Sequence, residues 1–416
     1  MKFIINKLSL LFSLEMVFSL FLLSAVFKES IAIPFDLSLL LFVVVVGVCL
    51  FRLMRNPTLP LVSLFPTVVF LMLSSLVMVS YIYAPASQYS ADKVIKFFLF
   101  TFTSFFVPLF FFKKGISVKK FINSTFIITL ILTVYTLVMI VSNDSTQNFI
   151  AFNEGNYLGL GRAIGLCAVI LLCKYLFSEK KIVSLLSFIL LPVVLYSLLS
   201  VGARMPLLGI FLVLLCMIPM TTIRIKKLNI TISKSFKKML FILIVAVTVI
   251  FYFVNSGYTS KTIDRISILF TQQGGGDSAS GRVDRYISSI QLFGENPLFG
   301  GGIGSFSLFF DGKDMRDYSH NIFLEMLSEL GIFGLVLISI LLIGGFVIGR
   351  KRIKQIKEDT QYEYTLLFLY VFYFVNANVT GDINDNRFLF ALLGCLFMNR
   401  DASQNLINSF KKLTWK

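Results

Sequence analysis

Residues 321–349 read NIFLEMLSELGIFGLVLISILLIGGFVIG, and the basic run RKRIK follows them. A helix needs about 20 apolar residues to cross a bilayer, so this segment is long enough to span one. Its first turns hold Asn321, Glu325 and Ser328, which form a polar stripe at helical spacing. Polar side chains in a span normally face the protein interior rather than lipid. The segment therefore predicts a membrane-spanning helix with a polar inner face at one end and positive charge beyond the other.

The whole chain has a composition like that of this segment. Of its 416 residues, 56% are hydrophobic and only 14% are charged, whereas soluble domains contain about 25% charged residues. This composition argues against a soluble globular protein and against a disordered one. The net charge of +16 does not indicate a nucleic-acid partner, because nucleic-acid binders place basic residues on polar faces rather than between long apolar runs.

Apolar runs predict twelve membrane-spanning helices in a single integral membrane domain, residues 1–416. They lie near residues 9–27, 36–51, 60–82, 94–112, 121–142, 157–178, 182–200, 205–220, 239–255, 321–349, 363–380 and 386–399. The runs are continuously apolar rather than alternating, which excludes a transmembrane β-barrel. The predicted fold class is therefore an all-α polytopic membrane protein. We expect the first run to be an uncleaved span, since it contains Glu15 and no clean cleavage site.

The basic residues predict the orientation of these spans. If the N-terminus is cytoplasmic and the spans alternate, 26 of the 38 Lys and Arg residues fall in cytoplasmic segments, and every cytoplasmic loop is basic. This agrees with the excess of Lys and Arg that cytoplasmic loops carry. We therefore expect both termini in the cytoplasm. The five cysteines lie in predicted spans without a metal-ligand spacing, so we expect no metal site.

One large loop, residues 256–320, separates the ninth and tenth predicted spans on the outer side. It is nearly neutral, so topology does not explain its arginines. Within it, residues 282–293 have a helical pattern, with Ser280 as N-cap and Gly294 and Pro297 as the stop. We predict an amphipathic helix that buries its apolar face at the membrane interface.

The apolar face of this helix and its arginines have separate expected roles. The apolar positions, at spacings of 3 and 4, are Val283, Tyr286, Ile287, Ile290 and Phe293. Arg282 and Arg285 form another stripe, which either faces a lipid-linked anion or contacts phospholipid headgroups.

The segment ENPLFGGGIGSF, residues 295–306, follows the helix. Its glycines permit tight turns and close approach of the backbone. It lacks the Gly-Lys-Ser/Thr of a phosphate-binding loop and the third glycine and strand context of a dinucleotide fingerprint. We therefore do not expect it to bind a nucleotide.

His320 is the only histidine in the chain and precedes the tenth span. With Ser319 as N-cap, His320 would lie in the first helical turn, where the positive end of the helix dipole disfavours an imidazolium ion. A neutral imidazole can accept a proton, as a general base must. The alternative is a polar residue that is merely satisfied at a helix start.

Three further arginines lie at or within the outer ends of predicted spans. Arg162 lies about one turn inside the sixth span, Arg204 lies between the seventh and eighth, and Arg387 follows Asp382 and Asp385 at the start of the twelfth. An arginine inside a span costs about 3 kcal/mol or more, so it needs a partner or a function. The arginines either bind an anion, pair with Asp382 or Asp385, or extend to outer headgroups.

These motifs together resemble one family. GARMPLLG (202–209), GRVDRYISSIQLFGENPLFGGGIGSF (281–306) and SHNIFLEMLSELGIFG (319–334) resemble the bacterial O-antigen ligase/polymerase family of polytopic membrane proteins. The similarity covers residues 200–210 and 280–335, and elsewhere only the layout of spans agrees. The resemblance implies an inner-membrane glycosyltransferase whose large loop is periplasmic and which uses neither metal nor cofactor.

The resemblance also implies a substrate and roles for residues. The family acts on glycans carried by undecaprenyl pyrophosphate, and its polymerases can have a chain-length regulator as partner. By motif match His320, Arg282 and Arg204 are expected to be catalytic. Further substrate contacts are expected from Arg162, Arg285, Asn321, Glu325 and Arg387. We favour an O-antigen polymerase, because residues 295–306 look more like polymerases. The alternatives are an O-antigen ligase that acts on lipid A-core and a flippase for the lipid-linked glycan.

Overall fold

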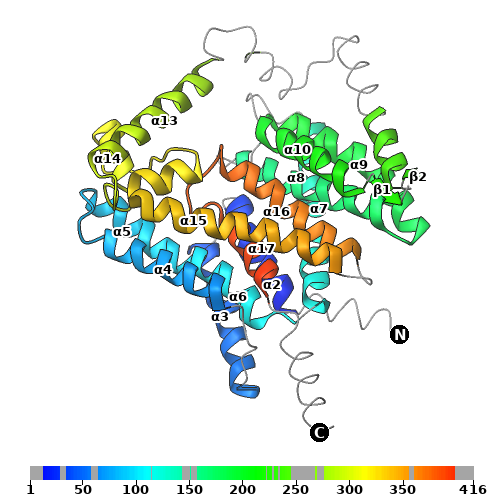
Figure 1. Cartoon of the computed structure of the whole chain (residues 1–416), viewed down its shortest axis with the longest axis horizontal. Coiled ribbons are helices and arrows are strands. Elements are labelled where there is room, and N and C mark those ends of the chain that lie inside the picture. Colours follow the sequence, from blue (N-terminus) through cyan, green and yellow to red (C-terminus); the bar gives the residue numbers. More distant parts are fainter. Residues whose placement is uncertain are drawn as a thin grey trace.

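The computed structural model describes most of the chain between residues 13 and 398. The described ranges are 13–28, 34–57, 64–113, 115–142, 150, 157–221, 223–226, 229–232, 235–244, 268, 276–355 and 360–398. Part of the ninth predicted span and most of residues 256–275 lie outside them. The described chain is predominantly helical (Figure 1).

The helices follow the predicted spans closely. They are α2 (Leu14–Phe27), α3 (Leu37–Arg55), α4 (Leu64–Ser80), α5 (Ser87–Lys96), the π-helical η2 (Phe97–Phe102), α6 (Thr103–Phe111), α7 (Ile116–Val141), α8 (Tyr157–Phe177), α9 (Lys181–Val201), α10 (Arg204–Thr221), α13 (Asp277–Glu295), α14 (Ser305–Asp311), α15 (Ile322–Gln355), α16 (Thr360–Ala377) and α17 (Arg387–Phe397). Residues 235–244 are also helical and overlap the start of the ninth predicted span.

The described part of the chain contains seven helices that are long and apolar enough to cross a membrane, and three shorter apolar ones. The structure thus agrees with a polytopic membrane protein, while the full count of twelve spans stays a prediction. One short hairpin, which the sequence analysis did not predict, interrupts the helices. Strands β1 (Ile223–Lys226) and β2 (Asn229–Ile232) pair antiparallel in the basic segment after α10. Isoleucine and threonine alternate there with other residues, a strand pattern that a search for apolar runs overlooks.

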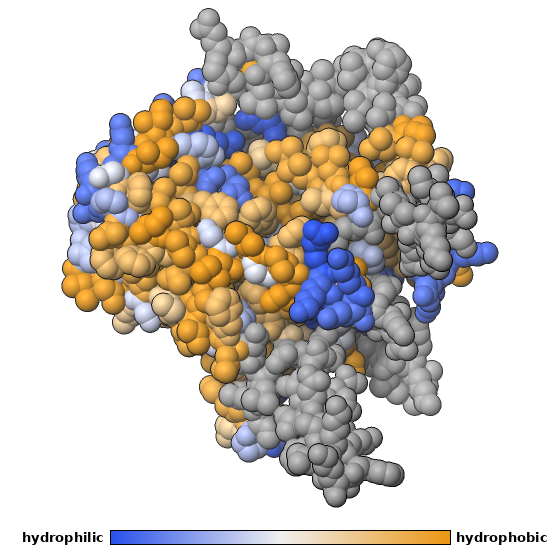
Figure 2. Space-filling model, viewed as in Figure 1, coloured by the Kyte–Doolittle hydropathy of each residue, from blue (hydrophilic) through white to orange (hydrophobic). Residues whose placement is uncertain are grey.

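The outer surface is strongly apolar. Figure 2 shows hydrophobic residues spread over much of the visible face. Soluble monomers rarely expose large contiguous apolar areas, so these side chains are suited to contact lipid. Helix α3 is the most exposed of these helices, since only 17% of its most apolar stretch is buried. The corresponding share of α8 is 83%. Helix α8 therefore lies at the centre of the bundle and α3 at its periphery.

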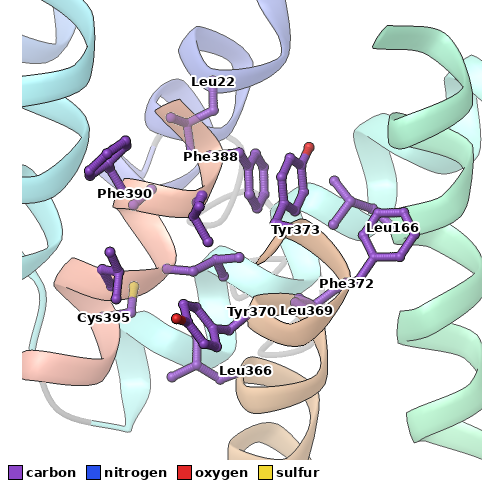
Figure 3. Close-up of a cluster of buried hydrophobic side chains, with 14 of the residues drawn as sticks. Leu22, Leu166, Leu366, Leu369, Tyr370, Phe372, Tyr373, Phe388, Phe390 and Cys395 are labelled. Atoms are coloured by element: carbon purple, nitrogen blue, oxygen red, sulfur yellow. The ribbon is translucent and has the colours of Figure 1, made fainter. Parts of the chain in front are cut away.

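The core lies where α2, α8, α16 and α17 meet. Figure 3 shows the buried rings of α16 and α17 facing one another, with Leu166 of α8 beside Phe372. Tyr373 and Phe388 stack with ring centroids 4.7 Å apart. Close packing of this kind fixes the relative positions of the helices, and so of the polar residues at their ends.

The two large polar segments lie at opposite ends of the bundle. Helices α13 and α14 lie at the end where α5 and α15 begin, and the β1–β2 hairpin lies at the far end (Figure 1). The side of the membrane on which each of the two segments lies stays a prediction.

Helix α15 is interrupted at Gly331, whose φ of 66° and ψ of −160° are not helical. Residues 297–302 fill the interruption. The amide of Ile332 donates to the carbonyl of Pro297, at 2.9 Å, and the carbonyl of Ser328 accepts from Gly301, also at 2.9 Å. Non-helical backbone at membrane depth is tolerated only when the protein satisfies it. The segment ENPLFGGGIGSF, residues 295–306, therefore supplies hydrogen-bond partners to the interrupted backbone of α15, and we call it the plug segment. Its glycines allow the two backbones to approach this closely.

We predict that Gly331→Ala destabilises the protein. A side chain at residue 331 would place its Cβ 2.3 Å from the carbonyl oxygen of Leu298. The backbone conformation alone costs a non-glycine residue about 1–3 kcal/mol. The melting temperature of the purified protein in detergent should fall. Gly47→Ala in α3 is the control, because its Cβ would meet no atom within 4 Å. An equal response of both variants would contradict the assignment.

Candidate functional site

His320 lies just before α15 and not in its first turn. The helix begins at Ile322, and Asn321 caps it, since Oδ1 of Asn321 accepts hydrogen bonds from the amides of Phe323 (2.9 Å) and Leu324 (3.1 Å). The prediction of Ser319 as N-cap was therefore wrong by two residues, since the helix begins at Ile322 and not at His320. His320 has a φ of 57°, and it is the one non-glycine residue with a positive φ in the described chain.

The imidazole of His320 packs against a neighbouring ring, and one of its nitrogens makes no hydrogen bond to the described residues. Its ring packs edge-on against Tyr318, with centroids 4.5 Å apart. Its Nδ1 is buried and has no hydrogen-bond partner among the described residues. Burial, together with the positive charges of Arg282 and Arg285, lowers the pKa of His320 to about 4, although Asp317 opposes the shift. The imidazole is therefore neutral at pH 7, as a general base requires.

Arg285 is fully engaged by the protein. Its Nε donates to Oδ1 of Asp317 at 3.1 Å, a terminal nitrogen donates to Oδ2 at 2.9 Å, and the other donates to the carbonyl of Gly281 at 3.0 Å. The ring of Phe310 lies under the guanidinium, 4.8 Å away. Asp317 in turn accepts from the amide of Tyr318 at 2.7 Å. Arg285 thus fixes the turn that carries Tyr318 against His320.

Arg282 lies one turn earlier on α13 and differs from Arg285. It is half-buried, and the described residues offer it no carboxylate partner. Its charge nevertheless reaches His320, whose pKa it lowers. Helix α13 begins at Asp277, three residues before the predicted cap at Ser280. Of the predicted apolar face, Val283 and Ile287 are 53% and 50% exposed, as an interfacial helix requires.

Arg316 also belongs to this cluster, and the sequence analysis did not select it. Its guanidinium donates to Oδ2 of Asp385 at 2.7 Å and to Oδ2 of Asp382 at 3.3 Å. It lies over the ring of Tyr318, 5.3 Å from the centroid. The aspartates were predicted to pair with an arginine of the spans, but the ion pairs that the structure gives them are with Arg316. Arg316 lies among alternating charges in the loop, so the sequence did not indicate which carboxylates it pairs with.

A small hollow lies beside these residues. Its walls come from α14 and the turn after it, and the lining residues are Ser307, Asp311, Lys313, Met315, Arg316 and Asp317. Hydroxyl, carboxylate and cationic groups of this kind can hydrogen-bond to sugar hydroxyls.

Arg162 lies on the inner side of the same cluster. Its side chain is 7% exposed, and it donates to Oδ1 of Asn386 at 3.5 Å. Burial raises the pKa of Tyr318, and the charges of Arg316 and Arg162 act against that rise. Arg162 is therefore within electrostatic reach of the turn that holds His320.

Arg204 is the first residue of α10 and is half-buried. Beside it, Ala203 packs on Gly161 of α8 so closely that a Cβ on Gly161 would lie 2.5 Å from that of Ala203. The start of α10 is thus next to the turn of α8 that carries Arg162.

Arg387 points to a different place from the other predicted arginines. Its Nε donates to the carbonyl of Leu22 at 3.1 Å, and a terminal nitrogen donates to Ser24 at 3.2 Å. Its guanidinium lies 5.2 Å from the ring centroid of Phe21 and 5.5 Å from that of Phe100. These contacts join α17 to α2.

Glu325 and Asn321 are also committed to internal contacts. The side chain of Glu325 is 1% exposed and lies 2.7 Å from Nζ of Lys93 in α5. Asn321, besides capping α15, donates from Nδ2 to the carbonyl of Asn378 at 3.1 Å. Lys93 and its second partner, Glu329, were missed because the fourth span was predicted to begin at residue 94. Two glutamates four residues apart in a span were a signal that a buried cation faces them.

Comparison with known families agrees with the motifs. Residues 195–339 match the O-antigen ligase family. The matched stretch includes Arg204, Arg282, Arg285 and His320, so the resemblance is confirmed over the region that contains the candidate site. No curated protein matches the chain.

We predict that His320 titrates far below an ordinary histidine. Because it is the only histidine, ¹³C-histidine labelling of tag-free protein should give one imidazole signal. Its midpoint should lie near pH 4 rather than near 6.5. Arg282→Gln should raise the midpoint by removing a nearby positive charge, whereas Lys313→Gln, in the exposed loop, should leave it unchanged. A midpoint at or above 6.5 in the unsubstituted protein would exclude the described environment.

Proposed function

We propose that this protein is a surface-polysaccharide polymerase of the O-antigen type in the bacterial inner membrane. It transfers a glycan from an undecaprenyl-pyrophosphate donor to a lipid-linked repeat unit on the periplasmic face. The observation that carries the proposal is a neutral histidine whose Nδ1 has no hydrogen-bond partner among the described residues, within the electrostatic reach of Arg282, both in the segment that matches the family. A proton acceptor next to phosphate-binding cations is the arrangement that this transfer needs.

The reaction divides between the base and the arginines. The acceptor hydroxyl oxygen attacks the anomeric carbon while the bond from that carbon to the pyrophosphate oxygen breaks. His320 takes the hydroxyl proton, and the leaving pyrophosphate keeps the electron pair of the broken bond. A single displacement of this kind inverts the anomeric centre. Arg282 and Arg204 bind the pyrophosphate, since guanidinium groups bind phosphate through paired hydrogen bonds.

Donor binding also strengthens the base. In the free protein, burial and, after it, the charges of nearby arginines lower the pKa of His320. A bound pyrophosphate brings negative charge to the same place and favours the imidazolium ion. His320 therefore becomes more basic when the donor is bound. The acceptor sugar enters at the hollow beside Arg316 and Asp317, whose polar lining suits hydroxyl groups.

The second candidate is an O-antigen ligase, and the observation that favours it is the description of the matched family. Both reactions use the same donor and leaving group, and they differ in the acceptor. A flippase for the same glycan would move the donor without breaking the glycosidic bond. Polymer formed in vitro by purified protein from lipid-linked repeat units alone would distinguish polymerase from both.

We predict that Arg282→Ala and His320→Ala each slow this transfer by about 100-fold or more, since they remove charge stabilisation and the base respectively. Polymer length and initial rate are measured in nanodiscs, with EDTA present, because the mechanism routes no step through a metal. Asp284→Ala, which removes an exposed charge from the same helix as Arg282, is the control and should keep most of the rate. Full-length polymer from Arg282→Ala or His320→Ala protein would refute these assignments.

A chromosomal deletion tests the acceptor. Without a polymerase, cells should carry core plus one repeat unit on their surface lipid. Without a ligase, they should carry bare core, with polymer left on the carrier lipid. Gel electrophoresis of surface polysaccharide separates the two patterns. We expect core plus one repeat unit, restored to polymer by the intact gene, and bare core would assign the protein as the ligase.

A further inference from the structure

A buried ion cluster lies next to the site and has no part in the proposed reaction. Nζ of Lys93 lies 2.7 Å from Oε1 of Glu325, 2.8 Å from Oε1 of Glu329 and 2.7 Å from Oε2 of Glu329. The exposed fractions of the three side chains are 0%, 1% and 0%. Charged groups inside a membrane-spanning bundle are costly. The arrangement therefore calls for a reason beyond packing.

The cluster holds a short, separate piece of helix. The interruption at Gly331 divides α15, so residues 322–330 are not joined to the long remainder by continuous helical backbone. Glu325 and Glu329 both lie on this short piece, while Lys93 lies on α5. His320 and its capping neighbour Asn321 come directly before the piece. The position of His320 thus depends on what holds residues 322–330.

The same cluster also fixes the loops on either side of the piece. Oε1 of Glu325 accepts from the amide of Ile383 at 3.2 Å, and the carbonyl of Lys93 accepts from Nδ2 of Asn384 at 2.9 Å. Glu329 accepts from the amide of Gly304 in the plug segment. Helix α5 itself is tied to the outer loop, because Asp314 accepts from the amides of its first turn at 2.8 Å.

The arginines of the donor site are carried by other elements. Arg204 begins α10, and Arg282 lies on α13. No described ion pair links the Lys93 cluster to either of them. The Lys93 cluster therefore holds the helix piece next to His320 directly, and it reaches α13 only through the segment of residues 295–306.

We infer that Lys93, through Glu325 and Glu329, is a positioning residue that sets His320 against the donor without contacting substrate. This inference rests on the proposed function for its kinetic consequences. It reassigns Glu325 from substrate contact to support of the base. Loss of Lys93 should then impair proton removal while leaving the pyrophosphate ligands in place.

The test compares Lys93→Met with His320→Ala and Arg282→Ala in nanodiscs. We expect Lys93→Met to lower kcat by about 100-fold, as loss of a general base does, with little change in the affinity for a fluorescent polyprenyl pyrophosphate. Arg282→Ala should instead weaken that affinity. Lys93→Arg should restore most of the turnover, because it keeps a positive charge between the two glutamates.

A second measurement, hydrogen exchange, reports on residues 322–330 independently of activity. Hydrogen exchange of residues 319–330 should accelerate in Lys93→Met, while α7 keeps its protection. If this variant does not accumulate, Glu329→Gln serves in its place, since it keeps the shape of the side chain and leaves Lys93 paired with Glu325.

Arg352→Met is the matched control at the other end of α15. Arg352 is also buried and paired, 3.3 Å from Glu363, and it donates to the carbonyl of Leu396 at 2.8 Å. Its loss should lower yield without changing turnover per folded protein or exchange at residues 319–330. Equal effects of Lys93→Met and Arg352→Met, or unchanged exchange at 319–330 in Lys93→Met, would overturn the inference. A failure of the proposed function would differ, because the unsubstituted protein would then form no product while the exchange difference remained.

Discussion

The interruption of α15 at Gly331 is the constraint on which the candidate site depends. A backbone amide and a carbonyl leave the helical ladder there, and an apolar environment offers no water to receive them. Residues 297–302 supply both missing partners, through Pro297 and Gly301. The connection between α13 and α14 is thereby fixed against the start of α15. Arg282, Arg285 and His320 come together because their two segments meet at this plug.

The arginines around the site differ in whether a carboxylate of the protein already pairs with them. The guanidinium of Arg285 donates to Asp317, and that of Arg316 donates to Asp382 and Asp385. A guanidinium that is held by a carboxylate fixes structure, and it does not readily release that partner for a ligand. Arg282 has no such partner among the described residues and lies one turn from Arg285 on the same helix. Arg285 is thus held by the protein, whereas Arg282 is the arginine that the proposed function assigns to an incoming anion.

The membrane class and most helices followed from the sequence because lipid imposes a length and a polarity that apolar runs record directly. Helices such as α8, predicted at 157–178 and found at Tyr157–Phe177, needed no other information. The site was only partly predictable. Arg282 and His320 were predicted from motifs and stay predictions, whereas the cap at Asn321 depended on which side chain reached the amides. Lys93 and Arg316 were missed because their partners lie more than 60 residues away in sequence, at Glu329 and Asp382. Pairing over such distances is decided by packing of the bundle.

The net charge of +16 illustrates the same limit. Most positive residues fit the role of topology markers, so the total says little about substrate. Near His320, the relevant quantity is the net charge that remains after the internal ion pairs have formed. Carboxylates of Asp317, Asp382 and Asp385 offset Arg285 and Arg316. Arg282 remains beside a neutral histidine, and Arg162 lies within electrostatic reach of the same turn. A surplus of positive charge next to a proton acceptor is unfavourable for an imidazolium ion in the empty site, and it becomes tolerable once an anion arrives. In the proposed function, this arrangement couples the basicity of His320 to the binding of the anionic donor.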